Sequence, residues 1–156
     1  MKNTFLLLFF LAGFSCFSQQ NKTTKTEVVP PIEVIQSFEN QFPKIKPVWS
    51  SDYEGADSDD QRYMAYFELG KTTISMHYDK LGKVKIVEES ILLDHLPNTV
   101  LEYLKNNFPT FKINDAVKIR NDKNVNTFEV GIGNATKFYV AQFDATGYFL
   151  QMVEKK

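Results

Sequence analysis

Few side chains in this sequence are suited to acid–base, nucleophilic or metal chemistry. The chain has two histidines, His77 and His95, and a single cysteine, Cys16. A hydrolytic triad or a zinc site needs a histidine beside a nucleophile or beside further ligands. His77 alternates with Thr73 and Ser75 along a strand-like segment, so we expect all three on an open sheet face, and His95 lies in a link. We therefore identify no catalytic residues, no metal site and no cofactor site.

A run of carboxylates raises the separate question of calcium binding. The run consists of Asp52, Glu54, Asp57, Asp59 and Asp60. A calcium loop of the EF-hand type needs glycine at its sixth position, where this run has Asp57. We interpret the run as a solvated connector between two strands. It concentrates negative charge at one hairpin tip, which suits a basic partner.

Aromatic and sulfur-containing side chains are better candidates for binding. Met64 and Tyr66 lie on the side of their predicted strand opposite its apolar residues. Together with Tyr53 and His77 they form our set of candidate partner contacts, because exposed aromatic side chains serve as interface anchors. The alternative, in which these side chains pack under loops or in the core, stays open. Trp49 is a core candidate.

The N-terminal segment predicts export. Residues 1–18 have a positive start, an apolar run at 5–14 and small residues before a polar stretch, which is the pattern of a secretory signal peptide. The apolar run is too short to span ~30 Å of hydrocarbon. Residues 19–30 are polar and predict a flexible leader. A lipoprotein with Cys16 as its lipidated first residue is the alternative, which the bulky Phe14 disfavours.

Composition predicts a packed domain with no general affinity for nucleic acid. The chain has 156 residues, of which 43% are hydrophobic and 14% aromatic, enough for a core. Its formal net charge of −1 gives no attraction to nucleic acid or to anionic lipid. We expect no transmembrane span in the mature chain.

The sequence repeats one pattern twice. Residues 34–43 and 100–109 each carry apolar side chains at a helical spacing and end in Phe-Pro, since proline disfavours a helical residue before it. The second Phe-Pro follows the first by 66 residues. An Asp-x-x-Gly turn at Asp79 recurs at Asp144, 65 residues later. Four strand-like segments follow each helix, so we infer an internal duplication.

The fold class follows from this repeat. We predict an α+β domain over residues 31–156, in which one α-β-β-β-β unit covers about 31–90 and the second about 96–156. Tight turns require antiparallel pairing within each unit. Each helix has one apolar stripe and must cover a sheet face. The result is an antiparallel sheet of up to eight strands with both helices packed on one face and the other face open.

The motifs at the helix ends, strand starts and turns resemble those of the secreted PepSY-like family, whose fold is similar to that of β-lactamase-inhibitor proteins (BLIP). The motifs are Phe42-Pro43, Val48-Trp49, Tyr78-Asp79-Lys80-Leu81-Gly82, Leu96-Pro97, Phe108-Pro109 and Phe143-Asp144-Ala145-Thr146-Gly147. The resemblance covers about residues 32–153. It implies a small exported bacterial protein that acts as a non-catalytic binding or inhibitory module, and it supplies no catalytic residues.

The expected function is therefore recognition. We expect an exported protein, periplasmic or extracellular, that is not an enzyme and binds a protein or peptide in the envelope or outside the cell through its open sheet face. The alternative is an envelope-associated structural or accessory protein tethered through Cys16.

Overall fold

Two halves with the same order of elements make up the chain in the computed structural model, which describes residues 28–53 and 61–155. The first half consists of α1 (Ile32–Gln41), β1 (Val48–Tyr53), β2 (Gln61–Leu69), β3 (Thr72–Tyr78) and β4 (Val84–Ser90). After a short 3-10 turn, η1 (Leu93–His95), the second half consists of α2 (Asn98–Asn107), β5 (Lys112–Asn121), β6 (Asn126–Gly133), β7 (Phe138–Asp144) and β8 (Phe149–Lys155). The predicted signal peptide and residues 54–60 lie outside the described residues.

The two helices begin and end in the same way. Pro31 and Pro97 precede the first helical residue, where the missing proline N–H costs no hydrogen bond. Each helix stops at a phenylalanine with φ of −133°, Phe42 or Phe108, because the proline that follows disfavours helical geometry. The Phe-Pro signal of the sequence therefore predicted both helix ends correctly.

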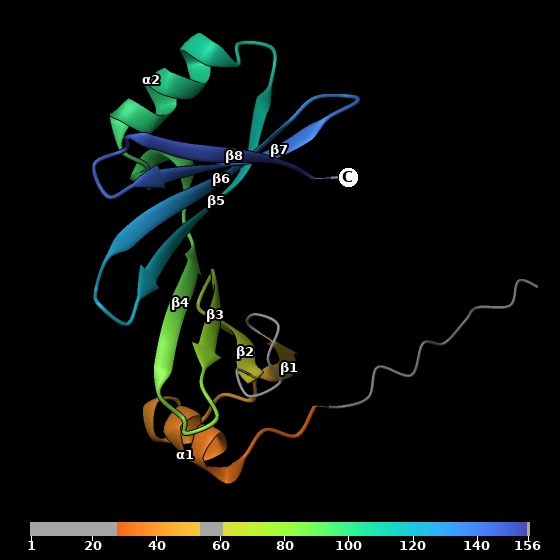
Figure 1. The fold of residues 1–156 in the computed structure, drawn as a ribbon, viewed down its shortest axis with the longest axis vertical. Coiled ribbons are helices and arrows are strands. Elements are labelled where there is room, and N and C mark those ends of the chain that lie inside the picture. The colour runs from red at the N-terminus through yellow and green to blue at the C-terminus, as the bar shows by residue number, and fades with distance from the viewer. Residues whose placement is uncertain (1–27, 54–60, 156) are drawn as a thin grey trace, which may run out of the picture.

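The eight strands form one antiparallel sheet in the order β1 to β8, as predicted. One row of directly paired residues crosses the sheet: Phe67, Ile74, Glu89, Lys118, Phe128 and Phe143. Directly paired residues point to the same side of a sheet, so the core under α1 and the core under α2 lie on one face. Figure 1 shows the helices at opposite ends of the molecule, with β4 and β5 between them.

Each half has its own apolar cluster. Beneath α1 lie Val34, Phe38, Tyr63, Ala65, Phe67, Met76 and Tyr78. Beneath α2 lie Leu96, Val100, Leu104, Ala116, Phe128, Val130, Ile132, Ala141 and Phe143. Trp49 packs against the first cluster, with its ring 5.6 Å from that of Phe38, which agrees with its expected place in the core. Burial raises the pKa of Tyr78 to about 12.

The last hairpin turn of each half rests on the start of the helix of that half. Gly82 has φ of 79° and lies so close to α1 that an added Cβ would be 2.4 Å from the carbonyl oxygen of Glu33. Gly147 has φ of 89° and faces Thr99 of α2 in the same way. Glycine is needed at both positions because the backbone is left-handed and the helix is close.

An aspartate side chain closes both of these turns. Oδ1 of Asp79 accepts hydrogen bonds from the backbone N–H groups of Leu81 and Lys83, each at 3.0 Å. Oδ1 of Asp144 accepts one from the Thr146 hydroxyl at 2.7 Å and one from the Tyr148 N–H at 2.9 Å. These hydrogen bonds hold the pKa of Asp144 below its usual value, and the bond from the Thr146 hydroxyl has the largest effect.

Membrane insertion by a helix has no support in the described part of the chain. Neither α1 nor α2, each of 10 residues, is long and apolar enough to cross a bilayer.

Candidate functional site

The face opposite the helices carries the side chains that the sequence singled out. Two rows of paired residues run across it. One row is Ser50, Met64, His77, Ile86 and Asn121. The next row is Val48, Tyr66, Ser75, Glu88, Ile119 and Thr127. Met64, Tyr66 and His77 therefore share the open face, and the alternation in the sequence predicted this placement correctly.

Strands β1 to β4 form a shallow pocket on this face. The pocket has a volume of about 220 Å³ and is lined by Asp52, Tyr53, Arg62, Met64, His77 and Ile86. Three of the four candidate contact residues thus meet in one place. The fourth, Tyr66, is 39% exposed, and its hydroxyl lies 3.6 Å from the sulfur of Met64, at the border of the pocket.

A polar cluster adjoins the pocket. Nε2 of His77 lies 3.0 Å from Oγ of Ser75 and 3.5 Å from Oε2 of Glu88. These are the residue types of a hydrolytic triad, but both contacts involve the same ring nitrogen. In a triad the carboxylate holds one ring nitrogen while the serine meets the other. Ser75 is also only 6% exposed, so a substrate has little access to its hydroxyl. The cluster is arranged to hold His77 in place at the pocket wall.

Ser75 lies on the open face but is covered by its neighbours. The alternation predicts its place on this face, and the register puts it there, while its side chain is only 6% exposed. Its direct neighbours in the row are Tyr66 on β2 and Glu88 on β4. The Ser75 hydroxyl also forms a hydrogen bond with Nε2 of His77. Large side chains on neighbouring strands cover a small one, which a single-strand pattern does not reveal.

His95 and the other possible metal-binding or catalytic side chains do not form a site in the described residues. His95 lies in η1 with 66% of its side chain exposed, and its nearest carboxylate is that of Asp94, at 4.0 Å. Within residues 28–53 and 61–155, no group of three or more His, Cys, Asp and Glu side chains is placed to hold a metal ion. The carboxylates between residues 54 and 60, which we interpret from the sequence as part of a solvated connector, lie outside the described residues.

The open face of the first half is acidic. Its strands carry the carboxylates of Asp52, Glu68 and Glu88 against the guanidinium of Arg62. Arg62 is itself engaged in an interaction. The face therefore has an excess of negative charge, which favours a basic partner surface.

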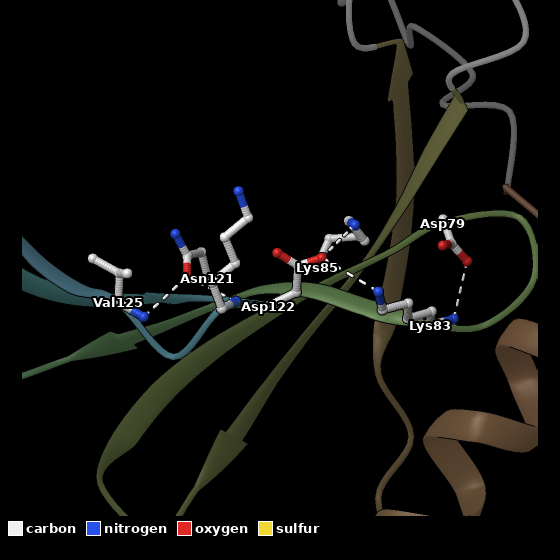
Figure 2. Close-up of polar contacts among 7 residues, drawn as sticks. Asp79, Lys83, Lys85, Asn121, Asp122 and Val125 are labelled. Atoms are coloured by element: carbon white, nitrogen blue, oxygen red, sulfur yellow. Dashed lines mark hydrogen bonds and ion pairs between the residues drawn. The ribbon is translucent and has the colours of Figure 1, made fainter.

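An ionic contact joins the two halves at the edge of this face. Figure 2 shows Asp122, in the turn between β5 and β6, with Lys83, which directly precedes β4, and Lys85, the second residue of β4. The Lys83 ammonium lies 3.5 Å from Oδ2 of Asp122, and Lys85 binds the same oxygen. The hydrogen bond from Lys85, with the positive charges of both lysines, holds the pKa of Asp122 below its ordinary range.

Sequence reasoning missed two grooves beside α2. One, of about 470 Å³, lies at the end of α2 and is lined by Leu101, Leu104, Lys105, Asn106, Phe108, Pro109, Phe111, Ile113 and Ile132. The other, of about 390 Å³, lies between α2 and β8 and includes Tyr103, Tyr148 and Phe149. Tyr148 directly follows the Asp-x-x-Gly turn, and this exposed aromatic was the signal available in the sequence.

An open eight-stranded antiparallel sheet with two helices on one face defines a BLIP-like fold, and solved structures share it. A protein from Bacteroides eggerthii that is predicted to be periplasmic has a TM-score of 0.69 at 14% identity, over 81% of this chain and 90% of that chain. A DUF2874 family protein from Bacteroides ovatus has a TM-score of 0.66 at 17% identity, over 81% and 89%. A BLIP-like protein from Bacteroides fragilis has a TM-score of 0.60 at 18% identity, over 84% and 91%.

These similarities establish the fold of the chain and leave its function open, because one fold hosts many activities. No protein-family model matches the chain, and no curated protein sequence does. The similarity supports a BLIP-like fold, whereas the narrower PepSY-like assignment stays a prediction.

Proposed function

We propose that this protein is an exported binding module that recognises a basic segment of a protein or peptide through the open face of its first half. The observation that carries the proposal is the pocket of about 220 Å³, in which Tyr53, Met64 and His77 meet. They come from three different strands, so the pocket exists only in the folded sheet.

The pocket has the composition of an interface anchor site. Met64 and Ile86 supply an apolar floor, and Tyr53, with 55% of its surface exposed, supplies an aromatic wall. Aromatic and methionine side chains are enriched at the centres of interfaces, where they bury much area at low entropic cost. Asp52 and Arg62 stand directly opposite each other and line the same pocket, so groups of both charges border it, and the negative excess comes from the wider open face.

The proposed function is binding without catalysis. The shared ring nitrogen of His77 and the buried hydroxyl of Ser75 leave no activated nucleophile in this cluster. Inhibition of an envelope enzyme is one form that such binding takes. The predicted signal peptide and the periplasmic prediction for a protein of the same fold support action outside the cytoplasm.

Affinity capture from the native periplasm tests the proposal. The tagged wild-type protein is expected to retain a stoichiometric partner, and Met64→Ala/Tyr66→Ala is expected to weaken retention at least about 10-fold, as truncation of interface anchors does. Retention is expected to fall as salt rises, because the open face is acidic. Leu81→Ala is the matched control, since Leu81 is 75% exposed in the turn between β3 and β4. Equal capture by wild type and by the double variant contradicts the proposal.

A further inference from the structure

The junction between the two halves is polar on the face that carries the helices. The helices lie at opposite ends of the molecule, with β4 and β5 between them (Figure 1). A pocket of about 140 Å³ lies at this junction, and we call it the junction pocket; it is lined by Val87, Glu89, Lys118, Arg120 and Asn126. Glu89 stands opposite Lys118 in the row that crosses both cores. Arg120 stands between Val87 and Asn126 in the next row, so all five residues lie on the helix side of the sheet.

The two cations of the junction pocket are not neutralised by a carboxylate of the protein. Lys118 and Arg120 lie two residues apart on the same side of β5, and within residues 28–53 and 61–155 neither forms an ion pair. Glu89 faces Lys118 across the strand pair but forms no ion pair with it. Two unpaired cations on one strand favour a ligand carboxylate, whose oxygens accept a charge-assisted hydrogen bond from each.

The acceptor groups of the junction pocket lie on either side of these cations, Glu89 on β4 and Asn126 on β6. Oδ1 of Asn126 is buried and has no hydrogen-bond partner in the described part of the chain. Buried polar atoms of native proteins are almost always hydrogen-bonded, so this oxygen needs a donor. An ammonium group is such a donor, and the Glu89 carboxylate balances its charge. The pocket thus combines cations for a negative group with acceptors for a positive group.

We propose that the junction pocket binds a free α-amino acid with a small side chain, such as alanine. The carboxylate of the ligand binds the Lys118 ammonium and the Arg120 guanidinium, and its ammonium group donates to Oδ1 of Asn126. Val87 supplies the apolar part of the lining, against which the methyl group of alanine packs. The volume agrees with this ligand, because a cavity of about 150 Å³ accommodates benzene, which has as many heavy atoms as alanine.

Charge and size distinguish this ligand from other small molecules. The lining carries two positive side chains and one negative, so a zwitterion adds no net charge, whereas a phosphate dianion meets the Glu89 carboxylate. Acetate supplies no hydrogen-bond donor for Asn126. A peptide is larger and carries its two charged termini on different residues. Few contacts and partial exposure make the binding weak, with an expected Kd of about 1 mM.

An NMR titration of the ¹⁵N-labelled mature protein with L-alanine tests the site. Saturable shifts are expected at the backbone amides of the lining residues and at the side-chain amide of Asn126, with half-saturation near about 1 mM. Acetate and methylammonium each carry one of the two charges, and each is expected to bind at least about 10-fold more weakly, because alanine holds both groups in one molecule. The absence of a saturable shift up to about 50 mM alanine overturns the proposal. Acetate that binds as tightly as alanine overturns it as well, because the pocket is then a general anion site.

Two variants and a matched control assign the contacts. Arg120→Gln removes a carboxylate partner, and Asn126→Leu removes the unpaired oxygen. Each is expected to weaken alanine binding at least about 10-fold, as the loss of a hydrogen bond to a charged group does. Lys80→Gln, in the exposed turn between β3 and β4, removes a cation outside the pocket and is expected to leave binding unchanged. The dispersion of the NMR spectrum verifies that each variant is folded.

The outcomes of these variants are decisive for the junction pocket alone. Unchanged affinity in Arg120→Gln or in Asn126→Leu overturns the proposal, and so does an equal loss in Lys80→Gln. The junction pocket and the pocket of the open face lie on opposite sides of the sheet, since Met64 and His77 belong to the rows of the open face. Partner capture by the open face is therefore expected to be the same in all three variants, and the two proposals can fail separately.

Discussion

The contact between the Gly82 turn and α1 permits a stability prediction with an internal control. In Gly82→Ala the new Cβ would lie 2.4 Å from the carbonyl oxygen and 2.9 Å from the carbonyl carbon of Glu33. These are backbone atoms of the helix, which no side-chain rotation can move. The turn must therefore separate from α1. Gly70 is the matched control, because its φ of 66° is also left-handed but an added Cβ meets nothing within 4 Å.

The two substitutions share one free-energy term and differ in another. A left-handed alanine costs about 1–2 kcal/mol relative to glycine. The smaller conformational freedom of the unfolded chain returns about 0.4–1 kcal/mol. Gly70→Ala is thus expected to lower the free energy of unfolding by about 0–1.6 kcal/mol. Gly82→Ala adds the cost of forcing atoms into a packed contact, about 1–3 kcal/mol, for a total of about 1–4.6 kcal/mol.

Urea unfolding followed by tryptophan fluorescence measures this difference. Trp49 is the single tryptophan and packs against Phe38 and Tyr78 in the core beneath α1, so it reports on the half that contains Gly82. The slope of the free energy against urea is expected to stay unchanged while the midpoint falls. Equal losses for Gly70→Ala and Gly82→Ala, or a greater loss for Gly70→Ala, would refute the claim that the turn is packed tightly on the helix.

Three further predictions concern ionisation and processing. The pKa of Asp122 is lowered from 3.8, so its contribution to stability is present above that pH and is lost as the pH falls through the lowered folded-state pKa. The urea midpoints of wild type and Asp122→Asn should therefore differ at pH 7 and converge as the pH is lowered into the acid range, and a constant difference would contradict the assignment. Tyr78, whose pKa is raised from 10.0 to about 12 by burial, should give an ionisation step near that pH in an ultraviolet titration, and Tyr78→Phe should remove this step. Because the folded state holds the Tyr78 proton more tightly than the unfolded state, stability should fall as the pH rises from 10 towards 12. Mass spectrometry of the exported protein should show an N-terminus near Gln19, whereas a lipidated Cys16 would contradict simple cleavage and favour an envelope tether.

Elements with a local cause could be predicted well. The helix of the first half was expected from Val34 to its Phe-Pro end and occupies Ile32–Gln41. Proline geometry and an apolar stripe act within one segment, so no distant residue is needed to recognise them. The hairpin turns followed equally from Asp79 and Gly82, whose side-chain hydrogen bond and left-handed backbone are local.

Strand β5 shows where local reasoning fell short. In the sequence, apolar and charged residues alternate only from Val117 to Arg120, whereas the strand spans Lys112–Asn121. Its pairing with β6 shifts register between Ile113 and Asp115. A bulge inserts one extra residue and breaks the period of two, so the alternation of apolar and polar residues is lost although the strand pairing continues.

The candidate site was predictable in its parts but not in its assembly. Met64 and His77 were placed on the open face by alternation alone. Their meeting with Tyr53 in one pocket, and the burial of Ser75, depend on which residues stand opposite across three strands. Alternation determines the face of each side chain, but its neighbours depend on the register between strands.

The sequence by itself determined two helix-and-four-strand units, the face that residues of the regularly alternating strands occupy, and the turns that join the strands. Its period-two and helical patterns, prolines and Asp-x-x-Gly turns all act over a few residues. The tertiary structure alone decided that β4 joins β5, that Lys85 meets Asp122 across 37 residues of sequence, and that the outer edge of β8 has no neighbour within the described chain. Those features depend on how twisted strands from distant segments align, and the free energy of that alignment comes from packing between segments.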